Sequence, residues 1–355
     1  MTRWSVLFLL NSLAGLGPTG APAAQAPATH SGICDASTAV AVASGKFLVA
    51  NDECAHMVES DACNQLLVYS SDAPGKALQE IDVTPFMALD KKKKEADIEG
   101  SAALDGKVYW ITSHGRNKDG EIKKNRYRLF ATEIKMDGGK IALTSVGVPY
   151  THLLENLLAG EAFKSFTQER LAPETIKNLA AEGTDAINIE GLSAWKAGQL
   201  LIGFRNPVPQ GKALLVPLEN PGELVSQPGK IARFGNPILF DLGGRGIRSI
   251  EYWGAHKIYL IMAGPIGDKG PEPWQQFRLY QWSGNPAEKP REITSADLTG
   301  LNPEAIVIYP EIKNRFQILS DDGGEKVGSR DCKELSDNDP NKKFRSRWID
   351  FSSQD

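Results

Sequence analysis

A unit of two short strand-like runs, with a polar start and a polar end, recurs along this chain of 355 residues. The clearest copy spans residues 188–209, NIEGLSAWKAGQLLIGFRNPVP, and further copies begin at Asp97, Ser249 and Asn302. A looser copy begins at Cys34. Each copy has a β-rich run, a turn and a second β-rich run. Repeats of roughly fifty residues with four strands each are typical of β-propeller blades.

The copies therefore predict an all-β fold, a β-propeller of five four-stranded blades. RYRLFATEI, ALLVPL and FRLYQW supply third strands, and KIALTSVGV and NPILFDL supply fourth strands. A count of six blades stays open, because the least regular segments could hide another repeat. We expect one propeller domain over residues 32–353.

Residues 1–26 resemble a secretory signal peptide. Arg3 gives a positive start, Trp4 to Leu16 form a short and mostly apolar run, and Ala21 to Ala26 offer small-residue cleavage sites. The apolar run is too short to span a bilayer, and no later stretch is long and apolar enough to do so. The sequence predicts an exported protein, periplasmic or secreted, without membrane insertion.

The composition is that of a globular domain, with 41% hydrophobic and 24% charged residues. The net charge is −4, and it becomes −5 once Arg3 is removed. A mildly acidic and mixed surface gives no electrostatic basis for binding nucleic acid. The sequence leaves the oligomeric state open, with a monomer as the default expectation.

Four cysteines in an exported chain favour disulfides over free thiols. Cys54 and Cys63 flank a short loop, whereas Cys34 and Cys332 lie near the two ends that a closed propeller must bring together. We therefore prefer the pairings 54–63 and 34–332 over the other two connectivities. The short bridge would contribute roughly 2–3 kcal/mol and the long bridge roughly 4–5 kcal/mol.

The strand pattern stops over residues 150–182, between the second and third blades. THLLENLLAGEAF places leucines at helical spacing, and Pro173 in APETIKNLAAE suits the first turn of a helix. This helical insertion could cover the polar face of the propeller as a lid. Packing against the rim is an equally good interpretation.

The polar starts of the repeated units predict a ring of side chains at one mouth of the central channel. Alternation along a strand places Glu99, Glu190, Glu251 and Glu304 on the same side of their blades. The loops after the second strands add further polar residues at the same face. The expected cation ligands are Asp97, Glu99, Asn188, Glu190, Asn302, Glu304 and Asp321, and the expected ligand-binding residues are Arg116, Asn117, Arg126, Arg205, Asn206, Arg245, Arg248 and Glu251.

Such a ring of carboxylates needs compensating charge, because two like charges about 4 Å apart repel by roughly 4 kcal/mol at an effective dielectric near 20. One solution is a bound Ca²⁺ ion, which prefers oxygen ligands. The other is pairing with Arg205, Arg245 and Arg248, which would suit a small anionic ligand or substrate. A third interpretation is that these residues only cap strands and bond backbone groups.

Several common catalytic signatures are missing, including G-x-S-x-G, H-E-x-x-H, the Walker loop and the dinucleotide fingerprint. His114 is the one histidine placed to act as a general base, and Glu190 is a carboxylate that could activate water. A single histidine at a strand end is more often a hydrogen-bonding residue without a catalytic role.

Motifs along the chain carry a family resemblance. They include GICDAS, EADIEG, SHGRNKDGE, INIEGL, LLIGFRNPVPQGKALLVPL, LFDLGGRGIRSIEY, FRLYQW and LNPEAIVIYP with SDDGG. Together they resemble the bacterial domain of unknown function 3616, over nearly all of the chain from Gly32 to about Phe351. The resemblance implies a propeller with a shared polar face, related to phytase-like esterase propellers, and it assigns no catalyst. Ala36 stands in the first blade where the others place glutamate, so the ring is expected to be incomplete there.

Three functions therefore compete. A calcium-dependent hydrolase of phosphoesters or esters would use Glu99, Glu190 and Glu304 to hold the cation. A periplasmic binding propeller would recognise a ligand or partner without turning it over. A structural protein would simply have a plugged channel.

Overall fold

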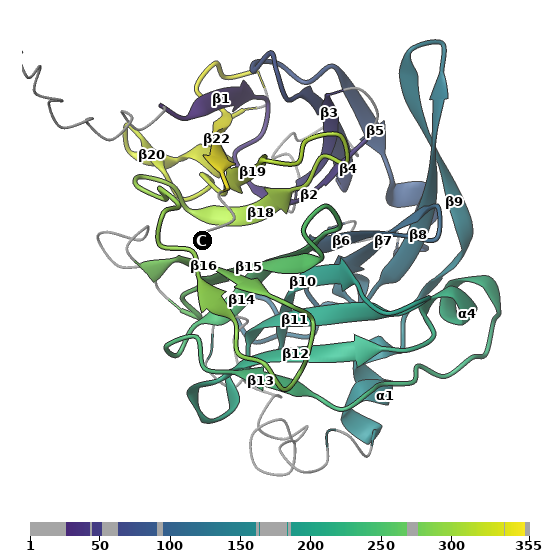
Figure 1. Cartoon of the computed structure of the whole chain (residues 1–355). Coiled ribbons are helices and arrows are strands. Elements are labelled where there is room, and N and C mark those ends of the chain that lie inside the picture. Colours follow the sequence, from purple (N-terminus) through teal and green to yellow (C-terminus); the bar gives the residue numbers. More distant parts are fainter. Residues whose placement is uncertain are drawn as a thin grey trace, which may run out of the picture.

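Five four-stranded sheets surround a common centre in the computed structural model (Figure 1). The structure describes residues 26–42, 45–51, 63–90, 95–160, 163, 183, 186–267, 276–336 and 338–351. The innermost strands β2, β6, β10, β14 and β18 contact one another in turn, and β18 contacts β2, so the ring is closed. The predicted β-propeller with five blades is confirmed.

Each of the first four blades is a run of consecutive antiparallel strands. Blade one consists of β2 (Ala36–Ala41), β3 (Lys46–Asn51), β4 (Gln65–Ser70) and β5 (Gln79–Asp82). Blade two consists of β6 (Ile98–Leu104), β7 (Lys107–Thr112), β8 (Leu129–Asp137) and β9 (Lys140–Tyr150). Blade three consists of β10 (Asn188–Ala194), β11 (Leu200–Asn206), β12 (Ala213–Leu218) and β13 (Ile238–Phe240). Blade four consists of β14 (Gly246–Trp253), β15 (Ile258–Gly264), β16 (Arg278–Trp282) and β17 (Arg291–Glu292).

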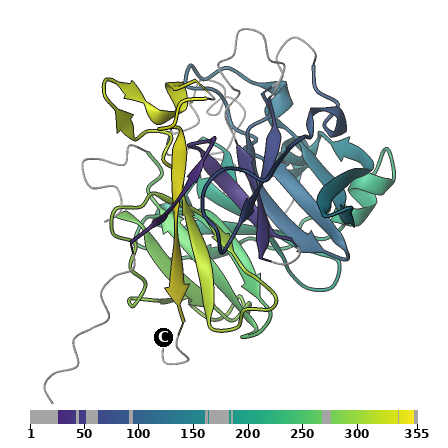
Figure 2. The ribbon, with the colours of Figure 1, turned by 90° about the horizontal axis from the view of Figure 1, so that it is seen from above.

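Blade five closes the ring with strands from both ends of the described chain. It consists of β18 (Pro303–Val307), β19 (Arg315–Ser320), β22 (Lys343–Asp350) and, outermost, β1 (Ala28–Ser31). In Figure 2, purple β1 lies along yellow β22. The predicted disulfide between Cys34 and Cys332 is present beside this closure, with a Cα–Cα distance of 6.0 Å. The other predicted pairing involves Cys54, which lies outside the described residues.

The core is divided among the interfaces between blades, because each sheet buries both of its faces against neighbours. Strands such as β11 and β12 are buried along their whole length, which explains their nearly continuous apolar sequence. Separate clusters of buried side chains fill the interfaces of blades one and two, two and three, three and four, four and five, and five and one. The cluster between blades five and one is further evidence that the propeller is closed.

Short helices and turns decorate the blades. Helix α1 (Leu153–Ala159) lies within the first of the two predicted helical runs, and Leu153 and Leu157 pack into the core between blades two and three. The second run, APETIKNLAAE, lies outside the described residues. Helix α4 (Pro221–Ser226) was not predicted and packs against β9. The remaining elements are η1 (Thr84–Phe86), η2 (Lys124–Arg126), η3 (Pro209–Gly211), η5 (Cys332–Glu334) and the small sheet of β20 (Lys326–Val327) and β21 (Arg330–Asp331).

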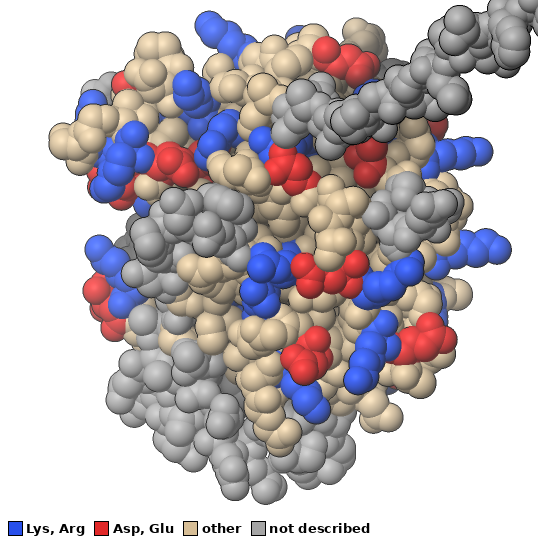
Figure 3. All heavy atoms as spheres, turned by 60° about the vertical axis from the view of Figure 1, so that its left-hand side comes forward, with Lys and Arg blue, Asp and Glu red and all other residues tan. Residues whose placement is uncertain are grey.

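No helix among the described residues is both long and apolar enough to cross a membrane. The predicted signal peptide over residues 1–26 lies almost wholly outside the described residues. Figure 3 shows acidic and basic side chains interspersed over one face, without a broad patch of either sign.

Candidate functional site

All five blades carry a β-bulge at the same place, near the start of the innermost strand. In blade three, Ile189 pairs with Phe204 and Gly191 pairs with Gly203, so Glu190 between them has no partner across the ladder. The other four blades skip one residue at the equivalent position. The skipped residues, here called the bulge ring, are Ser37, Glu99, Glu190, Arg248 and Glu304. A bulge re-aims a side chain, so each blade presents one residue at the same mouth of the channel.

Small residues follow the bulge in every blade, because neighbouring inner strands approach closely there. They are Thr38, Gly100, Gly191, Ser249 and Ala305. A Cβ atom on Gly191 would lie 3.1 Å from the Cα atom of Gly203 and 3.1 Å from Cγ2 of Ile247. The close approach brings bulge residues of different blades within reach of one another.

Arg248 contacts two other residues of the bulge ring, Glu190 and Glu304. Its Nε atom lies 3.0 Å from Oε2 of Glu190 and donates a hydrogen bond of 2.7 Å to Oε2 of Glu304, whereas its Nη2 atom pairs with Oε1 of Glu304. The side chains of Arg248 and Glu190 are only 2% and 5% exposed. One guanidinium therefore links carboxylates from blades three and five, in a buried arrangement in which loss of either partner is costly.

Glu190 is held from a second side. Arg205, in β11 of the same blade, places Nη1 3.2 Å from Oε1 of Glu190, and Asn188 donates from Nδ2 to the same oxygen at 3.2 Å. Burial lowers the pKa of Arg248 to about 10, and the charge of Arg205 acts in the same direction, whereas Glu190, Asp321 and Glu99 oppose this effect. Arg248 is thus charged at pH 7 and compensated by its neighbours.

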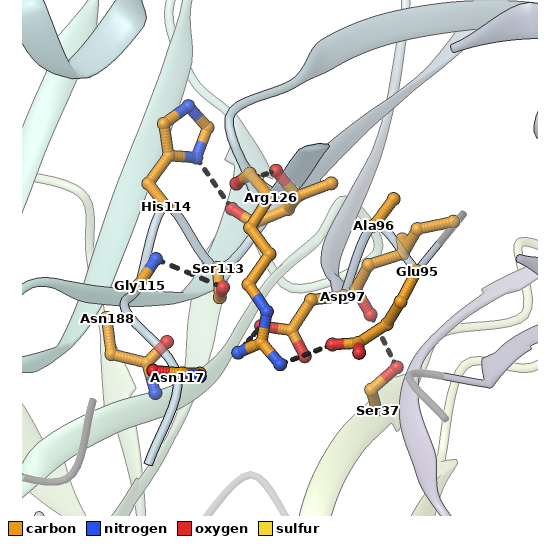
Figure 4. Close-up of polar contacts among 12 residues, drawn as sticks. Ser37, Glu95, Ala96, Asp97, Ser113, His114, Gly115, Asn117, Arg126 and Asn188 are labelled. Carbon is orange, nitrogen blue, oxygen red and sulfur yellow. Dashed lines mark hydrogen bonds and ion pairs between the residues drawn. The ribbon is translucent and has the colours of Figure 1, made fainter. Parts of the chain in front are cut away.

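A second cluster lies at the start of blade two (Figure 4). Nη1 of Arg126 pairs with Oδ2 of Asp97 at 2.9 Å, and its Nη2 atom pairs with Glu95. Although burial lowers the pKa of Arg126, Asp97, Glu95 and Glu99 raise it above its ordinary value. Ser37 donates a 2.6 Å hydrogen bond to the carbonyl of Ile98, which ties the bulge of blade one to blade two.

The equivalent corner of blade five is also made of ion pairs. Arg345, at the start of β22, donates from Nε and Nη2 to the two carboxylate oxygens of Asp322 at 2.8 and 2.6 Å. Asn302 donates from Nδ2 to Oε1 of Glu325 at 3.2 Å. Asp321 follows β19 directly, and its charge acts on Arg248.

The structure differs from the sequence expectation in blades one and four. The ring position of blade four is Arg248, and Glu251 lies three residues further along β14, at the opposite end of the channel. The sequence signal for the ring position was Ile247, which is equivalent to Ile98 and Ile189. The sequence expectation had instead used the segment Ser249–Ile250–Glu251, because it ends in an acid. In blade one the ring position is Ser37 and not Ala36.

Four other expected site residues form hydrogen bonds with backbone groups of loops. Arg245 donates to the carbonyls of Gln276 and Leu242, and Asn206 donates from Nδ2 to the carbonyl of Gly183 at 2.7 Å. Two more close the hairpin after β7. Arg116 donates to the carbonyl of Gly120 at 2.9 Å, and Oδ1 of Asn117 accepts from two backbone amides of its own turn. These contacts stabilise loops at the mouth.

His114, the histidine expected as a general base, is buried. It is 1% exposed, it stacks on Tyr127 at a centroid distance of 5.6 Å, and Nδ1 donates to the carbonyl of Thr112 at 2.8 Å. Burial lowers the pKa of His114 to about 4, so the imidazole is neutral at pH 7. A side chain in this environment is a weak base, and the contacts described for it do not include the bulge ring.

Several buried polar atoms at the mouth lack a hydrogen-bond partner within the described part of the chain. They include two acceptors, Oδ1 of Asn188 and Oδ1 of Asn302, and two donors, Nε of Arg126 and Nε of Arg205. Buried polar groups are nearly always satisfied, so such a group marks a place where water or a ligand binds. The four atoms come from blades two, three and five.

Carboxylates outnumber arginines at this mouth. Among the residues named above, the acidic ones are Glu95, Asp97, Glu99, Glu190, Glu304, Asp321, Asp322 and Glu325, and the arginines are Arg116, Arg126, Arg205, Arg245, Arg248 and Arg345. In the described residues, no three His, Cys, Asp or Glu side chains are arranged so that they could hold a metal ion. The oxygens of Glu190 and Glu304 that a cation would need already contact arginines.

A protein family described as "Protein of unknown function (DUF3616)" matches residues 35–172 and 151–307 of this chain. No curated protein matches this chain.

Solved structures that match this chain have low sequence identity to it and low TM-scores. The phage phi92 endosialidase has 7% identity and a TM-score of 0.39, over 83% of this chain and 52% of that chain, so this chain spans about half of the endosialidase. The Myceliophteria thermophila Cps50 (Swd1) β-propeller domain has 8% identity and a TM-score of 0.32, over 86% and 92%. A Thermus thermophilus protein described as a "putative oxidoreductase (glucose dehydrogenase)" has 11% identity and a TM-score of 0.37, over 91% of this chain and 100% of that chain. At these TM-scores the matches support no argument about activity.

Proposed function

Because the chain belongs to DUF3616, a family of unknown function, we propose its function from the polar residues around the bulge ring: this propeller binds a small polyhydroxylated molecule at the channel mouth. The observation that supports this proposal is the set of unpartnered atoms on Asn188, Asn302, Arg126 and Arg205. A hydroxyl group both donates and accepts, so a molecule with several hydroxyls can satisfy the two acceptors and the two donors together.

The charge arrangement favours a neutral ligand over an anion. Arg248 and Arg205 are already paired with Glu190 and Glu304, and the surrounding side chains carry an excess of negative charge. An anionic ligand, the other expectation from the sequence, would have to displace these carboxylates. Two like charges at about 4 Å cost roughly 4 kcal/mol at an effective dielectric near 20, so the neutral ligand is preferred.

Isothermal titration calorimetry at pH 7 tests the proposal with a neutral hexose, a hexuronate and a hexose phosphate. We expect the neutral hexose to bind more tightly than either anion. Asn302→Ala should weaken its binding about fivefold or more, since a lost hydrogen bond contributes about 1 kcal/mol. Ser193→Ala, at the opposite end of the channel, is the control and should bind like the wild type. Unchanged binding by Asn302→Ala would contradict the proposal.

A calcium-dependent hydrolase is the second candidate, and the excess of carboxylates at the mouth favours it. Asp97, Glu99, Glu190, Glu304 and Asp321 would supply oxygen ligands once a cation replaced an arginine contact. Bound Ca²⁺ would polarise a phosphoryl or carbonyl oxygen. This candidate predicts that Ca²⁺ raises the melting temperature and that a chelator removes turnover of p-nitrophenyl phosphate or p-nitrophenyl acetate. Absence of both effects would exclude it.

We also propose that the protein acts outside the cytoplasm. The disulfide between Cys34 and Cys332 supports this location, because such bridges persist in oxidising compartments. The expected signal peptide over residues 1–26 agrees with it. Fractionation of the native host would test the proposal, and recovery of the protein with the cytoplasm would contradict it.

A further inference from the structure

A cavity lies at the end of the channel opposite the bulge ring, where the inner strands end. Its volume is about 410 Å³, within the usual range for small-molecule sites. It is lined by Ala39, Val40, Ala41, Ala103, Ser193, Ala194, Glu251, Tyr252, Trp253, Gly254, Ala255, Ile308, Tyr309 and Pro310. These residues come from or directly follow β2, β6, β10, β14 and β18, so all five blades contribute to the cavity.

Glu251 is the single carboxyl group among the lining residues. It lies in β14 opposite Leu260 and is partly accessible, and no hydrogen bond or ion pair joins it to any other residue that the structure describes. Most of its neighbours in the cavity are alanine, valine, isoleucine and aromatic side chains. It is therefore an isolated carboxyl in largely apolar surroundings.

Isolation of this kind has a free-energy cost. Moving an ionised carboxylate from water into an apolar environment is unfavourable unless it is paired. Burial accordingly raises the pKa of Glu251 well above its ordinary value, and no neighbouring cation opposes this shift. A cation bound in the cavity would pair with the ionised Glu251 carboxylate and so offset the free-energy cost of burying its charge.

We propose that this cavity, here called the Glu251 cavity, binds a small organic ammonium ion, with Glu251 pairing with the ammonium group and the apolar walls surrounding the hydrocarbon part. Tyr252 is among the lining residues, and aromatic faces attract ammonium groups. Tyr252 is 40% exposed, so it is accessible to a ligand. This site is distinct from the bulge ring and independent of its ligand.

Other ligand classes fit the cavity less well. A bare divalent metal ion needs several oxygen ligands, and the lining supplies one carboxyl group. An anion would meet a carboxylate without any lining lysine, arginine or histidine to offset it. A neutral alcohol could accept or donate one hydrogen bond, but it would not compensate the charge.

The test compares benzylammonium with its neutral analogue benzyl alcohol and with benzoate, by calorimetric titration at pH 8. We expect wild-type protein to bind benzylammonium at least tenfold more tightly than benzyl alcohol. Glu251→Gln should remove that preference and leave benzyl alcohol binding unchanged. Glu80→Gln changes an exposed carboxyl on the outer strand of blade one and should behave as wild type.

A steric variant keeps the test decisive if Glu251→Gln does not fold. Ala103 lines the cavity and is exposed, so Ala103→Phe should obstruct the cavity without disturbing the core, and both benzyl compounds should then lose binding at least tenfold. Equal binding of benzylammonium and benzyl alcohol, tighter binding of benzoate, or benzylammonium binding that survives both substitutions would overturn the proposal.

Discussion

Glu190 shows how a single side chain in this protein is held by residues far away in the sequence. It faces two arginines and an asparagine at once, and one of the arginines, Arg248, belongs to the next blade. The residue type could be read from the sequence, because NIEG repeats the pattern of DIEG. Pairing with Arg205 and Arg248 was one of the two arrangements left open by the sequence. The sequence did not show that Arg248 itself occupies the ring position of blade four, where the other copies suggested an acid.

The buried His114 side chain predicts how the stability of the protein depends on pH. Its pKa falls from 6.5 to about 4 on folding, so the unfolded chain binds a proton more readily between these values. The neutral His114 side chain therefore contributes fully to the free energy of unfolding above pH 6.5. This contribution, about 3 kcal/mol, is lost as the pH falls toward 4. His114→Asn keeps a donor for the carbonyl of Thr112 and suits the positive φ of 52° at this position.

We expect His114→Asn to flatten the dependence of the urea midpoint on pH between 6.5 and 4. His30, whose pKa burial also lowers to about 4, should keep part of that dependence. A pH profile identical to that of the wild type would show that His114 is protonated, or exposed, in the folded protein.

At the scale of elements, the β-bulge is the feature that makes the site. Strand-like runs and their turns were readable from the sequence, and the predicted third and fourth strands match β8, β12, β16, β9 and β13. The bulge was not readable, because one unpaired residue leaves the apolar pattern nearly unchanged. Without it, simple alternation selected Glu251 in place of Arg248.

Gly246 allows the packing beside the bulge to be tested. A Cβ atom there would lie 1.8 Å from the carbonyl oxygen of Arg205, so Gly246→Ala must move β14 away from β11. We expect a loss of about 2–3 kcal/mol in the free energy of unfolding, from overpacking and a weakened pair between Arg205 and Glu190. The measurement is urea denaturation.

Gly324→Ala is the matched control, because nothing lies within 4 Å of its added Cβ atom. It should change the free energy of unfolding by less than about 0.5 kcal/mol. Equal effects of the two substitutions would contradict the close contact between Gly246 and Arg205.

For the whole molecule, closure brings distant residues around one axis. The sequence predicted five blades and the bridge from Cys34 to Cys332, and both are present. It did not predict that β1, which precedes Cys34, would complete blade five, because four residues carry too little pattern. The ring of side chains at the axis depends on the packing of neighbouring blades, since Glu304 of blade five reaches Arg248 of blade four.

A double-mutant cycle across that interface tests the central claim most directly. The free energies of unfolding would be measured for the wild type, Arg248→Met, Glu304→Gln and the double variant. We predict that each single substitution costs about 3–5 kcal/mol, because it leaves a buried charge without its partner. The double variant should cost less than their sum by at least about 1.5 kcal/mol. Additive effects, within about 0.5 kcal/mol, would show that these residues do not meet at the channel mouth.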